Sequence, residues 1–342
     1  MAKINLLTIH FGNSYGAIMQ TYATCKLLEE AGHTVTVINL TTPRRKTNKL
    51  SLQYIKSVIR NYTFNKFKKK CFSAMTQEGY SINECSIPDA DYTVVGSDQV
   101  WNRDITDKFG KAFYLDFVPE GQKRVSLSSS FGKSVWSEDE EYTESVKKEL
   151  EKFTALSVRE HTAVDILRKT FGLEAIQLLD PTLGYGKFEH LILNNTATEQ
   201  IYPFLLNTSK EAIKRAELIA TETATPLFKH TSYTATFEYS PRHWLTNIHN
   251  AKFVITDSFH GLALSIIYHK NFFVFCADPK KFTRLQSLLQ LIGYEDRFVT
   301  SEEDFLKRKE QLLQPIDYTR VDTILQKEQQ KYREFIQKNI PV

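Results

Sequence analysis

The sequence is poor in cysteine, glycine and proline. Its 342 residues include only four cysteines, 13 glycines and 10 prolines. This composition, with 42% hydrophobic residues, excludes a collagen-like repeat and a disordered chain. The cysteines are 46, 14 and 191 residues apart, at Cys25, Cys71, Cys85 and Cys276, which matches no disulfide framework and no zinc motif. We therefore expect reduced thiols, as in a reducing cytosol.

A long uninterrupted hydrophobic run is also missing. The longest apolar region, residues 253–275, is interrupted by Asp257, His260, His269 and Lys270, and such side chains are costly inside a bilayer. The first ten residues contain one basic residue and no small-x-small cleavage site, which argues against a signal peptide. We expect a cytoplasmic protein with no membrane-spanning segment.

Positive charge is concentrated in one segment. The chain has 44 Lys and Arg against 40 Asp and Glu, but residues 43–70 hold ten basic residues and no acidic one. This segment also has apolar residues at helical spacing, namely Leu52, Ile55, Ile59 and Tyr62, followed by Phe64 and Phe67. Such a helix could lie on an anionic membrane surface, at the inner face of the cell membrane, or it could pack its apolar stripe on the domain. No nucleic-acid module accompanies it, so we do not expect nucleic acid as a partner.

Strands and helices alternate along the chain. The hydrophobic pattern predicts a strand at 4–11, a helix at 16–32 and a strand at 34–40, which is a βαβ unit with a parallel sheet. The alternation restarts near residue 200, and a chain of this length usually divides into domains. We expect two Rossmann-like doubly wound α/β domains, residues 1–185 with a basic insertion at about 43–75 and residues 186–318, facing each other across a ligand-binding cleft. A final helix, within residues 319–342, could cross back to the first domain.

Short polar side chains follow several predicted strands of the first half. The first strand leads into Asn13, Tyr15 and Gly16, and later strands lead into Ser97, Asp98, Gln99, Trp101 and Asn102, and into Ser130. Hydroxyl and amide groups beside an aromatic ring suit a carbohydrate. The alternative is structural: Ser97 or Asp98 caps a helix and Trp101 lies in the core.

The second half carries one sharp motif, Thr256-Asp257-Ser258-Phe259-His260-Gly261. A buried strand ends in Asp257 and Ser258, which we expect to cap the next helix, and His260 follows in its first turn. A histidine there could face the cleft as a proton donor, although a structural role is the alternative. Arg159, Arg284, Lys229 and Arg297 are candidates to bind a small anion, with exposed surface arginine or lysine as the alternative for each. No metal site is expected.

Six motifs together resemble the polysaccharide pyruvyl transferases. In chain order they are Asn13-Ser14-Tyr15-Gly16-Ala17 with Gln20-Thr21-Tyr22-Ala23, Val95-Gly96-Ser97-Asp98-Gln99-Val100-Trp101-Asn102, Ser130-Phe131-Gly132, Ser157-Val158-Arg159-Glu160, Asp180-Pro181-Thr182-Leu183, and the motif ending in His260-Gly261. The resemblance implies a GT-B-like fold and transfer of pyruvate from phosphoenolpyruvate to a sugar diol as a cyclic ketal, with no cofactor. It further implies a saccharide acceptor of the kind that is carried on a polyprenyl lipid, in capsular, exopolysaccharide or cell-wall polymer synthesis.

The resemblance also implies roles for single residues. His260 is the expected catalytic acid. Some members have an arginine two residues before this histidine, where this chain has Ser258, so donor binding is assigned to a wider set: Arg159, Ser258, Gly261, Arg284, Lys229 and Ser130. The acceptor side is assigned to Asn13, Tyr15, Gly16, Ser97, Asp98, Gln99, Trp101 and Asn102. A GT-B glycosyltransferase using a nucleotide sugar and a non-catalytic sugar-binding component of a polysaccharide assembly complex are the alternative functions.

Overall fold

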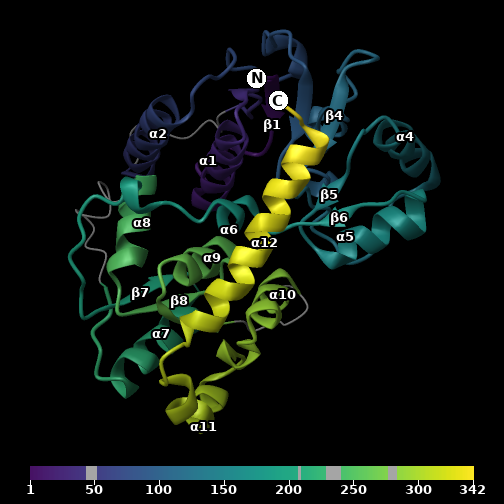
Figure 1. Cartoon of the computed structure of the whole chain (residues 1–342). Coiled ribbons are helices and arrows are strands. Elements are labelled where there is room, and N and C mark those ends of the chain that lie inside the picture. The colour runs from purple at the N-terminus through teal and green to yellow at the C-terminus, as the bar shows by residue number, and fades with distance from the viewer. Residues whose placement is uncertain (44–51, 207–208, 229–239, 276–282) are drawn as a thin grey trace. The chain divides into compact units, whose positions relative to one another are not determined.

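In a computed structural model, the chain forms two compact α/β units (Figure 1). Each unit is described by itself. The structure describes residues 1–43, 52–206, 209–228, 240–275 and 283–342, so Lys229 and Cys276 lie outside the described residues. The first unit comprises residues 1–55, 64–185 and 327–342, and the second comprises residues 56–63 and 186–326.

A parallel sheet forms the centre of the first unit. Its strands are β1 (Lys3–Leu7), β2 (Thr34–Val37), β3 (Tyr92–Val95) and β4 (Lys123–Ser126), in the order β2-β1-β3-β4. A two-stranded parallel sheet, β5 (Ser157–Val158) and β6 (Ile176–Gln177), continues from β4 through an isolated bridge between Val125 and Ala155. The carboxyl ends of these parallel strands therefore meet at one edge.

Helices connect the strands of the first unit. They are α1 (Tyr15–Glu30), α2 (Leu52–Cys71), whose residues 56–63 are grouped with the second unit, α3 (Arg103–Thr106), α4 (Glu140–Leu150), α5 (His161–Ile166), which continues as a π-helical turn, and α6 (Pro181–Tyr185). Twelve of the 16 residues of α1 are buried, because the helix packs on the sheet and against α6. Its start is fixed by Ser14, whose hydroxyl accepts a hydrogen bond from the Ala17 amide at 3.4 Å.

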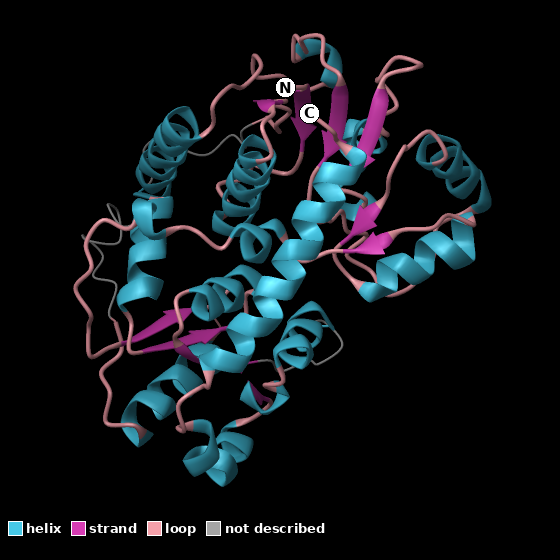
Figure 2. Cartoon of the chain, viewed as in Figure 1, coloured by secondary structure: helices cyan, strands magenta, loops and turns pink. Residues whose placement is uncertain are grey.

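The second unit repeats this architecture around a second parallel sheet. Its strands are β7 (Ile201–Phe204), β8 (Phe253–Thr256), β9 (Asn271–Phe275) and β10 (Phe298–Val299), in the order β10-β9-β8-β7. Its helices are α7 (Lys210–Glu222), α8 (Pro241–Asn250), α9 (Phe259–Ile267), α10 (Thr283–Ile292) and α11 (Glu302–Leu312). Strand β8 is buried along its whole length, and Figure 2 shows the strands of this sheet in magenta among cyan helices.

The last helix, α12 (Tyr318–Asn339), contributes residues to both units. In the second unit, Tyr318 stacks on His269 with ring centroids 4.4 Å apart. In the first unit, Tyr332 is fully buried and lies so close to Gly184 that a Cβ atom there would be 3.0 Å from its ring. Gln329 donates a hydrogen bond to the Leu183 carbonyl at 2.9 Å. A side chain at position 184 would therefore force the Tyr332 ring of α12 to move by a few tenths of an ångström.

The sequence-based prediction of an α/β fold with parallel sheets is confirmed. Elements that were not predicted include α6, β10 and α11. The apolar pattern also indicates a strand at 227–229, which in its described part is one bridge between Leu227 and Ile201. No helix within the described residues is both long and apolar enough to cross a bilayer. Cys25, Cys71 and Cys85 form no disulfide bond with one another.

Candidate functional site

The loop after β8 is held to the end of β7 by side chains of the sharpest sequence motif. The Thr256 hydroxyl donates to the Phe204 carbonyl at 2.7 Å and accepts from the Ser258 amide at 3.0 Å. Asp257 Oδ1 accepts a hydrogen bond from the Leu206 amide at 2.6 Å. These bonds join the carboxyl ends of two neighbouring strands, so they fix where the following helix begins.

Helix α9 begins at Ser258, as the sequence predicted. Ser258 has extended backbone angles (φ −104°, ψ 131°), and its hydroxyl accepts a hydrogen bond from the Gly261 amide at 3.4 Å. The prediction that Asp257 also caps this helix is wrong, because its carboxylate accepts from Leu206. Gly261 is required by space: a Cβ atom there would collide with the Thr256 hydroxyl and lie 3.0 Å from Phe204 Cδ1.

His260 lies in the first turn of α9, close to the carboxyl edge of the second sheet. Its side chain is nearly buried, with 9% of the residue exposed, and its ring meets the Phe259 ring edge-on at 5.4 Å. An imidazole is the side chain best suited to donate a proton near neutral pH. Arg284 lies at the start of α10 in the same unit and is half-buried.

In the first unit, a buried polar network joins the ends of four strands. Arg159, after β5, pairs with Asp180, after β6, at 2.7 Å and with Glu160 at 3.0 Å. The Ser97 hydroxyl, after β3, donates to Asp180 at 3.3 Å, and the Ser130 hydroxyl, after β4, donates to Glu160 at 2.9 Å. The sequence placed Ser97 and Ser130 directly after predicted strands, but it did not predict that these side chains bind Asp180 and Glu160.

The two carboxylates dominate the environment of Arg159. Burial disfavours the charge of its guanidinium, but the neighbouring carboxylates, Glu160 first and then Asp180, outweigh burial and raise the pKa. The guanidinium is therefore permanently charged and already bound to protein carboxylates, so a ligand anion would have to compete with them. This geometry argues against Arg159 as the main donor-binding cation and indicates a positioning role.

Trp101 lies in the core of the first unit. It is 1% exposed, its indole N–H donates to the Phe113 carbonyl at 3.0 Å, and its ring stacks on Tyr114 with centroids 6.0 Å apart. A ring enclosed in this way offers no face to a sugar. The expectation that Trp101 stacks on the acceptor is therefore wrong, and the core alternative is correct.

The other acceptor candidates lie in two turns of the first unit. Gly12 and Asn13 have positive φ angles of 76° and 53°, and they lead into Tyr15, which is half-buried, while Gly16 is buried within α1. In the second turn, Asp98 has a φ of 74°.

Amide groups complete this second turn. Asn102 donates to the Gln99 side-chain oxygen at 2.8 Å and caps α3 by accepting from the Asp104 amide at 3.1 Å. Asn13, Tyr15, Asp98 and Gln99 retain exposed surface, whereas Ser97 and Asn102 are buried. The partly exposed four are thus the accessible members of the predicted acceptor set.

The sequence did not single out Lys68 of α2, a lysine close to the turn that follows β1. Lys68 of α2 is close enough to His10 for its charge to matter: burial, and then the charge of Lys68, lower the pKa of His10 to about 4. Burial also lowers the pKa of Lys68 to about 8. In the sequence Lys68 is one of three consecutive lysines, and nothing in that run distinguishes it from its exposed neighbours.

The family model described as "Polysaccharide pyruvyl transferase" matches residues 15–276. The curated proteins gave no significant match. A UDP-GlcNAc 2-epimerase from Neisseria meningitidis superposes with a TM-score of 0.50 at 10% identity, covering 99% of both chains. A Listeria monocytogenes protein assigned as a UDP-N-acetylglucosamine 2-epimerase gives 0.50 at 12% identity, covering 95% of this chain and 91% of that one. At these identities the structural matches show the GT-B fold alone.

Proposed function

The chain belongs to the polysaccharide pyruvyl transferase family, and we propose that it transfers pyruvate from phosphoenolpyruvate to two hydroxyls of a saccharide, forming a cyclic ketal. The proposed acceptor is a hexose such as galactose, or an N-acetylhexosamine, in a capsular, exopolysaccharide or cell-wall polymer. The acceptor would be carried on a polyprenyl lipid. The observation that carries the proposal is the position of His260 in the first turn of α9, capped by Ser258.

The reaction needs one positioned acid. In the proposed step, the protonated imidazole of His260 gives its proton to the methylene carbon of phosphoenolpyruvate, and positive charge develops at C2. One sugar hydroxyl attacks C2, phosphate leaves, and the second hydroxyl attacks the same carbon to close the ring. Of the two protons that the hydroxyls lose, one restores the imidazolium and the other leaves with phosphate. The atoms and charges therefore balance without an oxidant or reductant.

The donor carries a carboxylate and a phosphate, and both need partners. Amides of the first turn of α9 favour an anion, since a helix amino terminus carries partial positive charge. Ser258 and Gly261 shape this turn, because their amides donate to the Thr256 and Ser258 hydroxyls, and Arg284 at the start of α10 is the proposed cation. Lys229 remains a candidate from the sequence, outside the described residues. For the acceptor we retain Asn13, Tyr15, Asp98 and Gln99 as contact residues, with Gly16, Ser97, Ser130, Asn102 and Arg159 supporting them.

Incubation with phosphoenolpyruvate and a panel of lipid-linked or aryl glycosides tests this function. Phosphate release and a mass increase of the glycoside are expected together. His260→Gln should lower the turnover number by about 10²- to 10⁴-fold, whereas His161→Gln, an exposed histidine of α5, should not. Turnover of the His260 variant within a few-fold of the unchanged chain would remove the imidazole from this role.

The two alternative functions give other results in the same assay. A nucleotide-sugar glycosyltransferase would bind a nucleoside diphosphate and release it on transfer. A non-catalytic sugar-binding component would bind the glycoside with no release of phosphate.

The exposed face of α2 supports a membrane contact for the lipid-linked acceptor. Ile55, Val58 and Tyr62 are 51%, 44% and 65% exposed, and they repeat at helical spacing into Lys66 and Lys69, which are also exposed. Apolar residues followed by lysines on one face are typical of a helix that lies on an anionic membrane surface.

Another part of α2 packs on the rest of the protein, which was the alternative to a membrane contact. Phe64 and Phe67 are buried, and their rings contact Tyr15 and Tyr22 of α1 at 5.1 Å and 6.0 Å. These contacts anchor the carboxyl-terminal half of α2 on the first unit. They leave the face at 55, 58 and 62 available, so we propose that this face contacts anionic lipid.

A further inference from the structure

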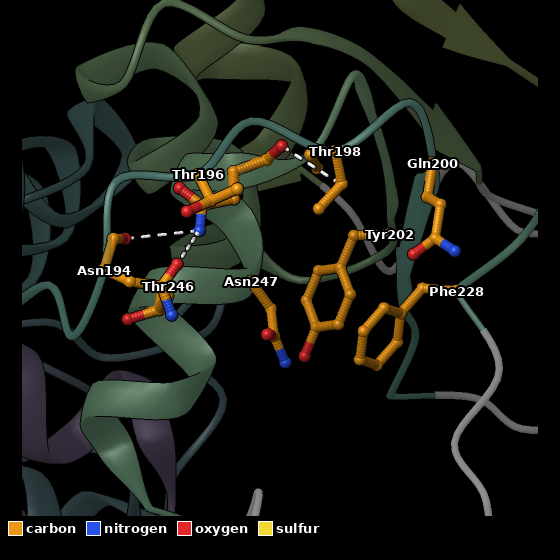
Figure 3. A pocket seen from close by; sticks show the side chains of 10 residues that line it. Asn194, Thr196, Thr198, Gln200, Tyr202, Phe228, Thr246 and Asn247 are labelled. Carbon is orange, nitrogen blue, oxygen red and sulfur yellow. Dashed lines mark hydrogen bonds between the residues drawn. The ribbon is translucent and has the colours of Figure 1, made fainter.

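The second unit contains a pocket of about 190 Å³ between the start of β7 and the end of α8 (Figure 3). It is formed by the chain leading into β7, by the last turns of α8 and by one aromatic residue after α7. The described lining residues are Asn194, Thr196, Thr198, Gln200, Tyr202, Phe228, Thr246, Asn247, Asn250 and Ala251.

This pocket lies at the opposite sheet edge from His260. Gln200 and Ala251 come just before β7 and β8, whereas Asp257 and His260 follow β8. The two strands are parallel, so the pocket is at their amino ends and the His260 loop at their carboxyl ends. Positions 251 and 257 are six steps apart along the chain, a span of about 20 Å at roughly 3.3 Å per step of extended chain. The pocket is therefore separate from the proposed reaction centre.

The lining is polar but uncharged. None of the described lining residues is acidic or basic. Six are asparagine or threonine and one is glutamine, so donors and acceptors occur side by side. Such a set matches the hydroxyl groups of a neutral sugar and has no cation for a phosphate or carboxylate. The volume is below the roughly 300–1,000 Å³ of drug-sized ligand sites, which favours one sugar ring over a whole nucleotide sugar.

One wall of the pocket is fixed by internal hydrogen bonds. Asn250 donates to the Asn194 side-chain oxygen at 2.8 Å, and its backbone carbonyl accepts from the Thr198 amide at 2.7 Å. The Thr246 hydroxyl accepts from the Leu193 amide at 3.0 Å. These bonds hold the wall in place before any ligand binds.

The other wall presents two aromatic rings and two side-chain amides. Tyr202 and Phe228 meet edge-on with ring centroids 5.5 Å apart. The side-chain amides of Gln200 and Asn247 make no hydrogen bond to any residue that the structure describes. In Figure 3 the Asn247 amide and the Tyr202 hydroxyl are directed to the same side of the pocket. Unused amides beside aromatic carbon are the groups that a sugar ring needs.

We propose that this pocket is a second saccharide site, which binds one neutral sugar unit away from the hydroxyls that react. Its use in retaining a polymeric or lipid-linked acceptor rests on the proposed function, because a second attachment point raises the effective concentration of the acceptor. Binding of the neutral sugar itself does not depend on pyruvate transfer.

Methyl-labelled threonine in the full chain provides a local test. Methyl β-galactoside and methyl β-N-acetylglucosaminide are titrated separately, and we expect one of them to shift the NMR signals of Thr196, Thr198 and Thr246. Asn247→Ala should weaken that binding by about 5- to 10-fold, the loss of roughly one hydrogen bond. Asn195→Ala changes an exposed asparagine of the same segment that does not line the pocket, and it should leave the affinity unchanged.

The outcomes separate the pocket from the reaction. No shift with either glycoside, a larger shift with phosphoenolpyruvate or uridine diphosphate, or equal weakening by the two asparagine variants would overturn the proposal. Threonine signals outside the pocket report whether Asn247→Ala is folded, and if it is not, Phe228→Leu takes its place with the same expected weakening. Pocket shifts that persist when no phosphate release is found would reject the proposed function and keep the second saccharide site.

Discussion

Replacing Arg159 by methionine tests whether the network at the sheet edge of the first unit is structural. The Arg159 side chain is 3% exposed and lies between Asp180, which is 0% exposed, and Glu160, which is 11% exposed. Methionine fills much of the same volume but leaves two carboxylates in a buried setting without their cation. Breaking a buried ion pair by removing one partner lowers the free energy of unfolding by about 3–5 kcal/mol. We expect a loss of that size for the first unit.

The measurement must resolve the two units, because a protein of two units need not unfold in one step. Hydrogen exchange followed by mass spectrometry reports the stability of each peptide, and peptides over β4 and β5 cover the network. Arg168→Met is the matched control. Arg168 also pairs with an aspartate, at 2.8 Å, but is 56% exposed, and such a surface pair contributes about 0–1 kcal/mol.

The same variant decides between the two roles of Arg159. If it is a positioning residue, phosphoenolpyruvate affinity should fall only together with local stability, and Arg159→Lys should recover part of both. A methionine variant as stable as the Arg168 control, but unable to bind phosphoenolpyruvate, would refute our reasoning. Arg159 would then be a ligand-binding cation, and its pairs with Asp180 and Glu160 would contribute little to the fold.

Three further changes test other parts of the structure. Gly261→Ala should lower the free energy of unfolding by about 1–3 kcal/mol, because the new methyl group overpacks against the Thr256 hydroxyl. The loss should be smaller in a Thr256→Ala background. An equal loss in both backgrounds, measured by urea unfolding, would contradict this contact as the cause. The pKa of His10 is about 4 in the folded chain, against 6.5 for an ordinary histidine, so the unfolded chain takes up this proton at a higher pH than the folded chain. As the pH falls from about 6.5 to 4, this difference lowers the free energy of unfolding by about 3 kcal/mol. His10→Asn should remove this contribution to the loss of stability in acid. Lys66→Gln with Lys69→Gln should weaken sedimentation with anionic vesicles by about 2 kcal/mol and leave neutral vesicles unaffected, whereas unchanged binding to anionic vesicles would exclude the α2 contact.

The sequence predicted those parts of the fold that depend on local pattern. Short continuous runs of apolar residues placed β3 and β8, which are buried along their whole length. The period of 3.6 residues placed α1 and α12, because burial of one helix face sets the spacing of apolar side chains. The Ser258 cap was predicted for the same reason, since a helix start depends on residues within one turn. Ser137 and Glu140 have the spacing of a capping box, but the cap of α4 is Asp139, whose carboxylate accepts a hydrogen bond from the Tyr142 amide.

The candidate site was predicted less well, because the roles of its residues depend on partners far along the chain. Of the two carboxylate partners of Arg159, the fully buried one, Asp180, lies 21 residues away along the chain. Trp101 is enclosed by rings from several elements, including Phe131 and Phe153. Lys68 differs from the neighbouring lysines only in the helix face that it occupies. A motif read along the sequence shows which side chains reach a sheet edge, but not which of them are already bound there.

The identity of residue 258 affects where the negative charge of the donor would be bound. The Ser258 hydroxyl accepts the hydrogen bond of the Gly261 amide and so completes the amino terminus of α9. An arginine, which the resemblance indicates at this place in some family members, has five donors and no acceptor, so it could not form this bond. With serine, the first turn of α9 offers backbone amides and His260, which is charged only while protonated, but no permanently charged side chain. A cation for the donor must then come from another element, and this requirement is our reason for assigning that role to Arg284 at the start of α10.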